Sequence, residues 1–573
     1  MTRLATSGVT CVNSRRKSNL VDREQGTGYR DLFCYSLSTV HCTLIIFLAI
    51  FVAGIFLPTN SVQAKKKNQP EKILYIPHDN RPVVDEQTIA VVESVGYQVV
   101  TPPEEFLGNR EKFGEPDKLW KWLKDNCKKD IRAAIISSDA MLYGSLVASR
   151  KHNIDRQIIL DRVELFREFR KDHKKLPIYV FGSIMRTPRS AEASGYEEPD
   201  YYRNYGANIF RYTALEDKQE VEGLDKREQK EIDFLQRLIP KKALSDWKDR
   251  HAKNFSANEK LIDLARDKNF NCLLLGRDDN APYSQTHMES RHLKKYGAGL
   301  EKNNFQTIAG IDEVGLMLLT RAVNDRTKNN PKVFVKYNYG RGAATVPSYS
   351  DESIGETIDA EIIAVGGKKT DYYKNADLIL AVNTNADGKT HEADGALNGS
   401  KERSGTEFFI DTMQEYLSAD KPVALADIAF ANGSDNALME LLNKRGMLFK
   451  LNAYSGWNTA TNSTGFALST GILSKRMNYT GRKNLLVTRY LDDWAYQANV
   501  RNIVAGQIKW LRGNGVYESL DEKIDVVTDE ATRMLNHFAK NNLQSANLSG
   551  DLQVKFPWNR MFESEITFKL LQR

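Results

Sequence analysis

Cysteine is scarce in this sequence. Of the five cysteines in 573 residues, Cys11, Cys34 and Cys42 precede a predicted leader cleavage point, which leaves Cys127 and Cys272. Two cysteines cannot form a disulfide framework, so an apolar core must hold the fold together. No local signal supports a bridge between these two residues.

The signatures of several common enzyme classes are also missing. The chain has no H-E-x-x-H, no G-x-S-x-G, no Walker loop and no G-x-G-x-x-G after a strand. Its nine histidines are scattered, and no two of them have the spacing of metal ligands. The cofactor therefore stays unknown and no metal ligand is predicted, although carboxylates that hold a divalent metal are left open as an alternative.

Basic residues are not concentrated in any one tract. The net charge is +7, but lysines and arginines are spread along the chain and do not alternate with aromatic residues. This pattern argues against nucleic acid as a partner. Hydrophobic residues at 41% and charged residues at 27% are typical of globular proteins. A chain of this length predicts two or more domains.

One long apolar run lies near the N-terminus. Thr43–Leu57 contains about 15 apolar residues, which suits the core of a signal peptide better than a full membrane span. Val62–Ala64 then has the small-residue spacing that a signal peptidase reads. We therefore predict an N-terminal extension over 1–40 and a signal peptide or membrane anchor over 41–64. The protein is expected to be exported, either secreted or anchored at the cell membrane by residues 43–57, with no other membrane contact.

From residue 72 onward, apolar strands alternate with helical segments. The first set of expected strands is Lys72–Pro82, Tyr97–Pro103, Arg132–Ala140, Pro177–Arg186, Asn271–Asp279 and Thr307–Glu313. Near-continuous apolar strands that alternate with helices predict a parallel sheet covered on both faces. We expect an α/β N-terminal domain over 72–330, either barrel-like or doubly wound. A polar, helical excursion over 190–268 interrupts it, and whether this excursion is a lid is left open.

A second set of strands predicts another domain. The segments are KVFVKYN, AEIIAVGG, DLILAVNT, PVALADIAF and LFKLNAY, with helices such as NALMELLNKR between them. They indicate a second, Rossmann-like parallel α/β domain over 331–470, followed by a mainly helical segment over 471–573. Side chains that carry out chemistry gather at the carboxyl ends of parallel strands, so the polar residues that follow each strand are the candidates.

Carboxylates follow several of the first strands. Asp278 and Asp279 end the run LLLGRDD, Glu313 follows TIAG, and Asp139 follows AAIISS. In a carboxylate pair on a partly buried rim, one pKa is raised, as a general acid requires. We predict Asp278 or Asp279 as the acid and Glu313 or Asp139 as the base or nucleophile. Helix capping is the competing explanation for Asp139, Asp312 and Glu313. Adjacent strand residues point to opposite faces, so only one of Asp278 and Asp279 is expected to face a given cleft.

Arginine, aromatic and amide side chains accompany these carboxylates. Arginines at strand ends can form charge-assisted hydrogen bonds. The segment AYSGWNTATN combines an aromatic face with amides and hydroxyls, as a sugar site requires. The predicted substrate-binding residues are Asp79, Arg81, Tyr143, Arg150, Arg186, Arg277, Tyr283, Asp427, Asn432, Tyr454, Trp457, Asn458, Thr459 and Asn462. Among them, Trp457, Asn458 and Asn462 are expected to form a sugar platform.

Seven segments of the chain resemble a known family. The segments are PHDNRP, SSDAMLYGSLVASR, GRDDNAPYS, GIDEVG, DIAFANGSDN, AYSGWNTATNSTG and FPWNRMFE. In this order they are similar to segments of the bacterial domain-of-unknown-function family 4127. The resemblance spans about residues 73–563. This chain departs from the family pattern in two places, where His78-Asp79-Asn80 replaces Leu-Asp-Asp and Gly144-Ser145 replaces Gly-Gly. The resemblance implies a bacterial source and supports Asp79 and Arg81 as site residues, but it names no reaction.

These features together predict an exported hydrolase that acts on a carbohydrate or glycan through paired carboxylates in an interdomain cleft. One alternative is a metal-assisted hydrolase of another bond, with Asp79, Asp278 and Asp279 as oxygen ligands. Another is a cell-surface protein that binds glycans or another polar small molecule without catalysis. In a fourth interpretation, these motifs are only caps and turns of the scaffold.

Overall fold

The computed structural model describes residues 69–192, 195–401, 403, 405–512 and 515–571. The predicted extension over 1–40 and the predicted leader over 41–64, with its apolar run at 43–57, lie outside these residues. Within the described ranges, no helix combines the length and the apolarity that crossing a membrane requires. Residues 69–573 form one compact unit.

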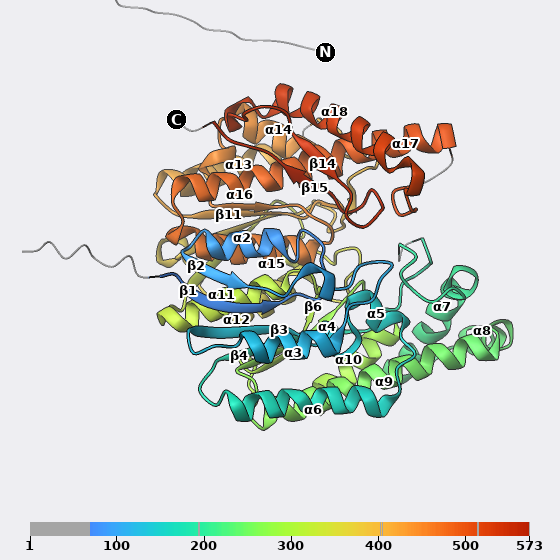
Figure 1. Cartoon of the computed structure of the whole chain (residues 1–573). Helices are drawn as coiled ribbons and strands as arrows, with labels where there is room; N and C mark the ends of the chain where they lie inside the picture. Colours follow the sequence, from blue (N-terminus) through green and yellow to red (C-terminus); the bar gives the residue numbers. More distant parts are fainter. Residues whose placement is uncertain (1–68, 193–194, 402, 404, 513–514, 572–573) are drawn as a thin grey trace, which may run out of the picture. The chain divides into compact units, whose positions relative to one another are not determined.

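Sheet A is an open sheet of six parallel strands in the order β2-β1-β3-β4-β5-β6. Its strands are β1 (Glu71–Ile76), β2 (Tyr97–Val100), β3 (Ile131–Ser137), β4 (Ile178–Ile184), β5 (Cys272–Arg277) and β6 (Phe305–Ala309). Because β2 and β6 are its two edges, the sheet is doubly wound and is not a barrel (Figure 1). The order of the strands reverses at β1, which lies between β2 and β3. Ligands of such folds bind beside a reversal of this kind, at the carboxyl ends of the strands.

Helices cover both faces of sheet A. They are α2 (Glu86–Glu93), α3 (Pro116–Asn126), α4 (Ser138–Tyr143), α5 (Leu146–Lys151), α6 (Arg156–Asp172), α10 (Gln285–Tyr296) and α11 (Val314–Thr327). Side chains alternate along each strand, so Ile73 and Tyr75 pack with α2 and α11 while Leu74 and Ile76 pack toward α3, α4 and α6. The near-continuous apolar runs that predicted a covered parallel sheet are thereby confirmed.

The predicted excursion consists of three helices between β4 and β5. They are α7 (Tyr202–Val221), α8 (Lys226–Leu238) and α9 (Lys241–Arg266), and α9 returns along α6. The chain turns between α7 and α8 at Gly223, where φ is 87°. Asp225 then starts α8 with a capping box to Glu228.

Sheet B has five parallel strands in the order β13-β11-β9-β7-β8. Its strands are β7 (Lys332–Tyr337), β8 (Lys368–Lys369), β9 (Leu378–Asn383), β11 (Val423–Asp427) and β13 (Ala453–Ser455). The helices are α12 (Ile354–Ala364), α13 (Thr406–Ser418), α14 (Asn436–Lys444) and α15 (Ala460–Leu473). As in sheet A, the first strand lies between the second and the third, which confirms a second parallel α/β unit. A short pair, β10 (His391–Glu392) with β12 (Phe430–Ala431), lies beside it.

One predicted strand of the second set is wrong. The segment AEIIAVGG lies at the end of α12, and the strand that follows it, β8, has only two residues. Ser353 and Glu356 form a capping box that starts this helix, and Ile358 and Ile362 are buried one turn apart. A short apolar run does not by itself distinguish a strand from a buried helical turn. Here the capping box upstream of the run starts a helix that continues into it.

The two sheets share one apolar core. Side chains of α11, α12 and α15 lie between Tyr75 and Phe181 of sheet A and Leu380 and Ala424 of sheet B. The carboxyl ends of the two sheets are therefore held in a fixed relation to each other.

The C-terminal segment is mainly helical, as predicted. It contains α16 (Tyr479–Arg489), a π-helix (Tyr490–Val500), α17 (Arg501–Arg512), α18 (Ile524–Asn542) and a hairpin of β14 (Gln553–Lys555) and β15 (Glu565–Thr567). The connection between β14 and β15 returns to the carboxyl edge of sheet A. There the Trp558 Nε1 donates to Asn80 Oδ1 at 2.8 Å, and Arg560 reaches Glu197.

Candidate active site

Strand ends of both sheets and the C-terminal connection enclose one small charged cavity. Its volume is about 60 Å³, which is room for roughly four water molecules. The lining residues are Arg81, Leu146, Arg150, Arg186, Gly195, Glu197, Asp278, Asp279, Asp312, Tyr349, Asn432, Asn458, Thr459, Tyr517, Arg560, Phe562 and Glu563. Four arginines and five carboxylates therefore lie together in one small, partly open space.

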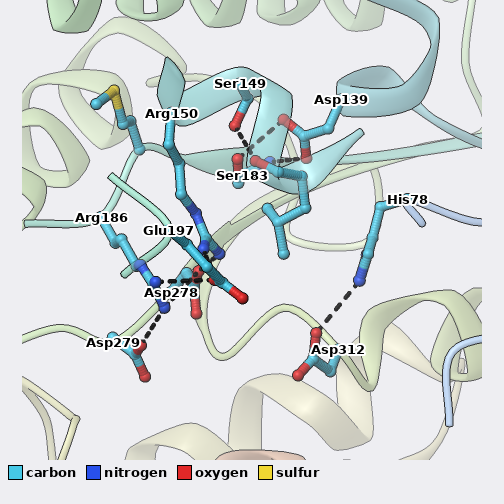
Figure 2. Close-up of polar contacts among 12 residues, drawn as sticks. His78, Asp139, Ser149, Arg150, Ser183, Arg186, Glu197, Asp278, Asp279 and Asp312 are labelled. Carbon is cyan, nitrogen blue, oxygen red and sulfur yellow. Dashed lines mark hydrogen bonds and ion pairs between the residues drawn. The ribbon is translucent and has the colours of Figure 1, made fainter. Parts of the chain in front are cut away.

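Glu197 is the centre of the ion-pair network. It accepts hydrogen bonds from Arg150, from Arg186 at 2.9 Å and from Arg560 at 2.7 Å. Figure 2 shows Arg150 and Arg186 converging on this side chain. Burial raises the pKa of Glu197, but the three arginines outweigh it and hold the pKa well below its usual range. A single carboxylate thus joins α5, the end of β4 and the β14–β15 connection.

Asp278 and Asp279 are the most exposed carboxylates of the lining. Their side chains are 13% and 18% exposed, whereas those of Glu197, Asp312 and Glu563 are 7% exposed or less. Arg150 donates to Asp278, and Arg186 Nη1 donates to Asp279 Oδ2 at 2.6 Å (Figure 2). Burial and the charge of Asp278 raise the pKa of Asp279 to about 7, against the opposing effect of Arg186 and Arg150. Asp279 is therefore poised to hold or release a proton near neutral pH.

Asp312 has the opposite electrostatic environment. Arg81 donates to both of its oxygens, at 2.6 and 3.2 Å, and His78 Nε2 lies 3.2 Å from Oδ1. Although burial raises the pKa of Asp312, the charge of Arg81 outweighs it, and the pKa lies well below its usual range. The Arg81 Nε in turn donates to the buried Asp79 at 3.0 Å. The cavity thus contains one carboxylate, Asp312, whose pKa is held low, and another, Asp279, whose pKa is raised.

The backbone is strained around the same cavity. Asp279, Tyr349, Asn432 and Asn458 all have a positive φ, of 39°, 64°, 62° and 58°. This left-handed region is uncommon for residues other than glycine, and it is a genuine outlier for tyrosine. Such residues cluster at functional sites, where the surrounding structure holds them in place. Asn432 and Asn458 are joined by a hydrogen bond of 2.7 Å from Asn432 N to Asn458 O.

The family model for the "Protein of unknown function (DUF4127)" matches residues 73–567. The chain belongs to this family. No curated protein and no solved structure matches the chain.

Each of the seven DUF4127-like segments supplies at least one residue of the cavity lining. Together these segments contain 66 of the 573 residues, yet they provide 12 of the 17 lining residues. The remaining five are Arg186, Gly195, Glu197, Tyr349 and Tyr517. Segments far apart in the sequence meet at this one place, so the cavity is the strongest candidate for a functional site in the described part of the chain.

Eight of the predicted site residues line the cavity. They are Arg81, Arg150, Arg186, Asp278, Asp279, Asn432, Asn458 and Thr459. Asp278 and Asp279 both reach it, contrary to the expectation for adjacent strand residues. The reason is that β5 ends at Arg277, and the left-handed backbone of Asp279 breaks the alternation.

The other predicted binding residues lie outside the lining. Asp79 supports Arg81 from behind. Tyr143 stacks on His152, and Arg277 pairs with Asp351 and Glu352 in the loop before α12. Tyr283 packs against His287. In sheet B, Tyr454 donates to Asp427 Oδ2 at 3.0 Å. Asn462 of α15 donates to Glu313, the residue before α11.

Trp457 is not an exposed sugar platform. It is 2% exposed and belongs to the core shared by the two sheets, with Phe466 and Phe562 against its ring. The aromatic rings that do line the cavity are Tyr349, Tyr517 and Phe562.

Asp139 and Glu313, two of the four predicted catalytic carboxylates, are buried away from the lining. Asp139 accepts hydrogen bonds from Ser183 N and Oγ at 2.8 and 2.9 Å, and so ties β3 to β4 (Figure 2). Ser137, and not Asp139, caps α4. Glu313 accepts from Asn462 at 2.6 Å, and its other oxygen has no partner among the described residues. Burial raises its pKa to about 8.

The residues that the sequence did not reveal come from connections between elements. Glu197 follows a turn in a polar loop, Tyr349 lies in the loop before α12, and Tyr517 follows α17. Asp312 was expected to be a helix cap, but its carboxylate binds Arg81 and His78. The segment FPWNRMFE was the one available signal for Arg560 and Glu563.

The carboxylates of the cavity are already engaged by arginines. Asp79, Asp278 and Asp279, the oxygen ligands of the metal-assisted alternative, pair with Arg81, Arg150 and Arg186 respectively. Among the described residues, no three His, Cys, Asp or Glu side chains are grouped so that they could hold a metal ion. The arrangement fits proton transfer and hydrogen bonding better than metal ligation.

Proposed function

We propose that this protein is an exported hydrolase that cleaves a glycosidic bond in a carbohydrate. Asp279 would act as the general acid, and Asp312 would act as the ionised carboxylate that serves as nucleophile or base. Burial and the charge of Asp278 keep the pKa of Asp279 high, and the charge of Arg81 keeps the pKa of Asp312 low.

The observation that carries this proposal is the difference between these two carboxylates in one cavity. Glycoside hydrolysis requires one carboxyl group that holds a proton and a second that is ionised. Environments that push two pKa values apart in this way assign the acid and its partner. The pKa of Asp279 is raised to about 7 while that of Asp312 is lowered, so both protonation states coexist near neutral pH.

The charge balance favours a neutral substrate. Four arginines face five carboxylates, so the cavity has no excess positive charge with which to attract an anion. Arginine–carboxylate pairs, Asn432, Asn458 and Thr459 offer donors and acceptors that suit hydroxyl groups. The rings of Tyr349, Tyr517 and Phe562 offer apolar faces for the C–H side of a sugar.

The cavity must widen to admit a sugar ring. Its walls include the loop with Gly195 and Glu197 and the connection with Arg560, which are joined by the Glu197–Arg560 ion pair. Opening between these two segments would break that ion pair and expose Asp278 and Asp279. The ion pair would form again over a bound ligand and exclude water, which strengthens electrostatic effects at the reacting bond.

The test is product formation by the full chain from a panel of neutral oligosaccharides, followed by mass spectrometry. Asp279→Asn keeps the shape and the left-handed backbone but removes the acidic proton, and Asp233→Asn is the control at an exposed position of α8. We expect the wild type and the control to release product, with a rate that falls as pH rises through about 7, and Asp279→Asn to lose at least ~100-fold in rate. Equal rates for all three proteins would contradict the assignment of Asp279.

A binding protein without catalysis is the second candidate, because Asp278, Asp279 and Asp312 are each already paired with an arginine. It predicts that Asp279→Asn retains sugar affinity and that the wild type forms no product from any sugar that it binds. The same panel therefore separates the two functions.

A further inference from the structure

The amino-terminal edge of sheet A carries a broad basic groove. Its volume is about 860 Å³, and it lies where β3, β4 and β5 begin and α11 ends. Strands of a parallel sheet all run in one direction, so this groove and the candidate active site are at opposite edges of the sheet.

The groove has a large excess of positive charge. Its lining contains eight basic residues and only two acidic ones, Asp172 and Asp325, an excess of six. The basic residues are Lys128, Lys129, Arg132, Lys171, Lys174, Lys175, Arg326 and Lys328. For comparison, the net charge of the whole chain is +7. These basic residues are scattered along the sequence, but the fold brings them together around one groove.

The six lysines of this set are exposed. The described part of the chain offers them no ion-pair partner, whereas Arg132 and Arg326 both pair with Glu71. Cations near helix ends are often explained by the helix dipole, and Lys171 and Lys328 lie at the ends of α6 and α11. Lys128, Lys129, Lys174 and Lys175 lie beyond the C-caps of α3 and α6, in the connections before β3 and β4, where the effect of the helix dipole falls off. The charge is available to a partner.

The chain enters the described unit at the same groove. Glu71, the first residue of β1, lies 3.4 Å from Arg132 Nε and 2.5 Å from Arg326 Nη2. The apolar run Thr43–Leu57 ends 14 residues before Glu71, a length of chain that spans at most about 50 Å. If this run stays as the predicted membrane anchor and is not removed as a signal peptide, the chain between it and Glu71 is short enough to keep the basic edge near the bilayer, and Lys65–Lys67 lie in that connection.

We propose that this groove docks on the surface of a membrane that contains anionic phospholipids. The lysines of the β3 and β4 connections contact the headgroup phosphates, and the apolar run, where it is retained as an anchor, holds the unit close to the bilayer. Since the candidate active site lies at the opposite edge of sheet A, its opening would face away from the membrane. The groove has no exposed aromatic side chain, so it lacks the stacking surface of proteins that bind single-stranded nucleic acid.

The experiment measures vesicle binding by residues 69–573, which form a compact unit with a complete core. Omitting the apolar run separates the groove from any insertion by that run. The vesicles consist of phosphatidylcholine alone or of an equimolar mixture with phosphatidylglycerol, and binding is followed by co-sedimentation at low and high salt. One variant replaces Lys128, Lys129, Lys174 and Lys175 with glutamine. The matched control replaces Lys226, Lys230, Lys241 and Lys242, which are exposed on α8 and α9.

Each lysine near an anionic bilayer strengthens binding by about five-fold, so the groove variant should bind several hundred-fold more weakly, on the order of five to the fourth power. We expect the wild type and the control to bind the mixed vesicles at low salt and to dissociate from them at high salt. Neither protein should bind vesicles of phosphatidylcholine alone. Equal binding by the two variants, or no preference for phosphatidylglycerol, would overturn the proposal. Tighter binding to a single-stranded oligonucleotide than to the mixed vesicles would also overturn the proposal. It would show that the groove binds a soluble polyanion and not a membrane surface.

Discussion

Replacing Glu313 with glutamine should change how the stability of this protein depends on pH. The Glu313 carboxyl lies between the two sheets, where Asn462 donates to one oxygen and the other has no partner among the described residues. Its pKa is raised from 4.5 to about 8, mainly by burial. The folded protein therefore holds a proton on Glu313 at neutral pH, whereas the unfolded chain does not.

The sign and size of the effect follow from this difference. Because the pKa is raised in the folded state, folding is favoured at low pH, and this contribution is lost as pH rises from about 4.5 toward 8. Between about pH 5 and pH 7, the free energy of unfolding should fall by about 2 to 3 kcal/mol on account of this one group. Glutamine at this position does not titrate, so the Glu313→Gln variant should lack this part of the pH dependence.

Urea unfolding at the two pH values, followed by tryptophan fluorescence, measures the effect. The free energy of unfolding of Glu313→Gln relative to the wild type should rise by about 2 to 3 kcal/mol from pH 5 to pH 7. A constant penalty from the new amide group would shift both values equally and would not change this difference. Glu105→Gln makes the same chemical change at an exposed position and should show no such rise. Parallel pH profiles for the wild type and Glu313→Gln would refute the assignment of a buried, protonated carboxyl.

Three further outcomes follow from particular contacts. Glu197→Gln should lower the free energy of unfolding by about 3 kcal/mol at neutral pH, because three buried arginines lose their shared carboxylate. Since the pKa of Glu197 is lowered in the folded protein, this difference should shrink as pH falls below about 4.5. Urea unfolding would detect it, and a loss no larger than that of the exposed control Glu192→Gln would contradict the network. Gly465→Ala places a methyl group 2.4 Å from Glu313 Cγ and should destabilise the fold by about 1 to 3 kcal/mol, and an unchanged melting temperature would show that the contact is not tight. The thiol of Cys272 is free and fully buried, with its pKa raised to about 12, so iodoacetamide should modify it only on unfolding; rapid modification of the native protein, detected by mass spectrometry, would contradict this placement.

The sequence predicted most of the fold because strands buried on both faces leave a simple pattern. The apolar runs that became β1, β3, β4, β5, β9 and β11 are continuous and end in polar residues. The segment AEIIAVGG has the same appearance but became helical, because the Ser353–Glu356 capping box starts α12 upstream of it. The order of the strands in each sheet could not be predicted from the apolar pattern, since it depends on contacts between residues far apart in the chain.

The candidate site was predicted where it follows strand ends and missed where it depends on long-range contacts. Arg81, Asp278 and Asp279 follow strands and were found. Glu197 comes from a loop inside the polar excursion, and only the folded chain brings it between three arginines. Trp457 illustrates the opposite error, because the motif around it reaches the cavity through Asn458 and Thr459 while its own ring packs into the core.

The central claim is that the charged cavity binds a neutral carbohydrate, and a thermal-shift screen of the full chain tests it most directly. The panel contains neutral oligosaccharides, acidic sugars and divalent metal salts. Asn458→Gly is the matched variant, since it removes a side chain of the lining while glycine accepts the left-handed backbone at this position. We predict that a neutral oligosaccharide raises the melting temperature of the wild type and raises it less, or not at all, in Asn458→Gly. A rise that only acidic sugars or metals produce, or one that is unchanged in Asn458→Gly, would contradict the account.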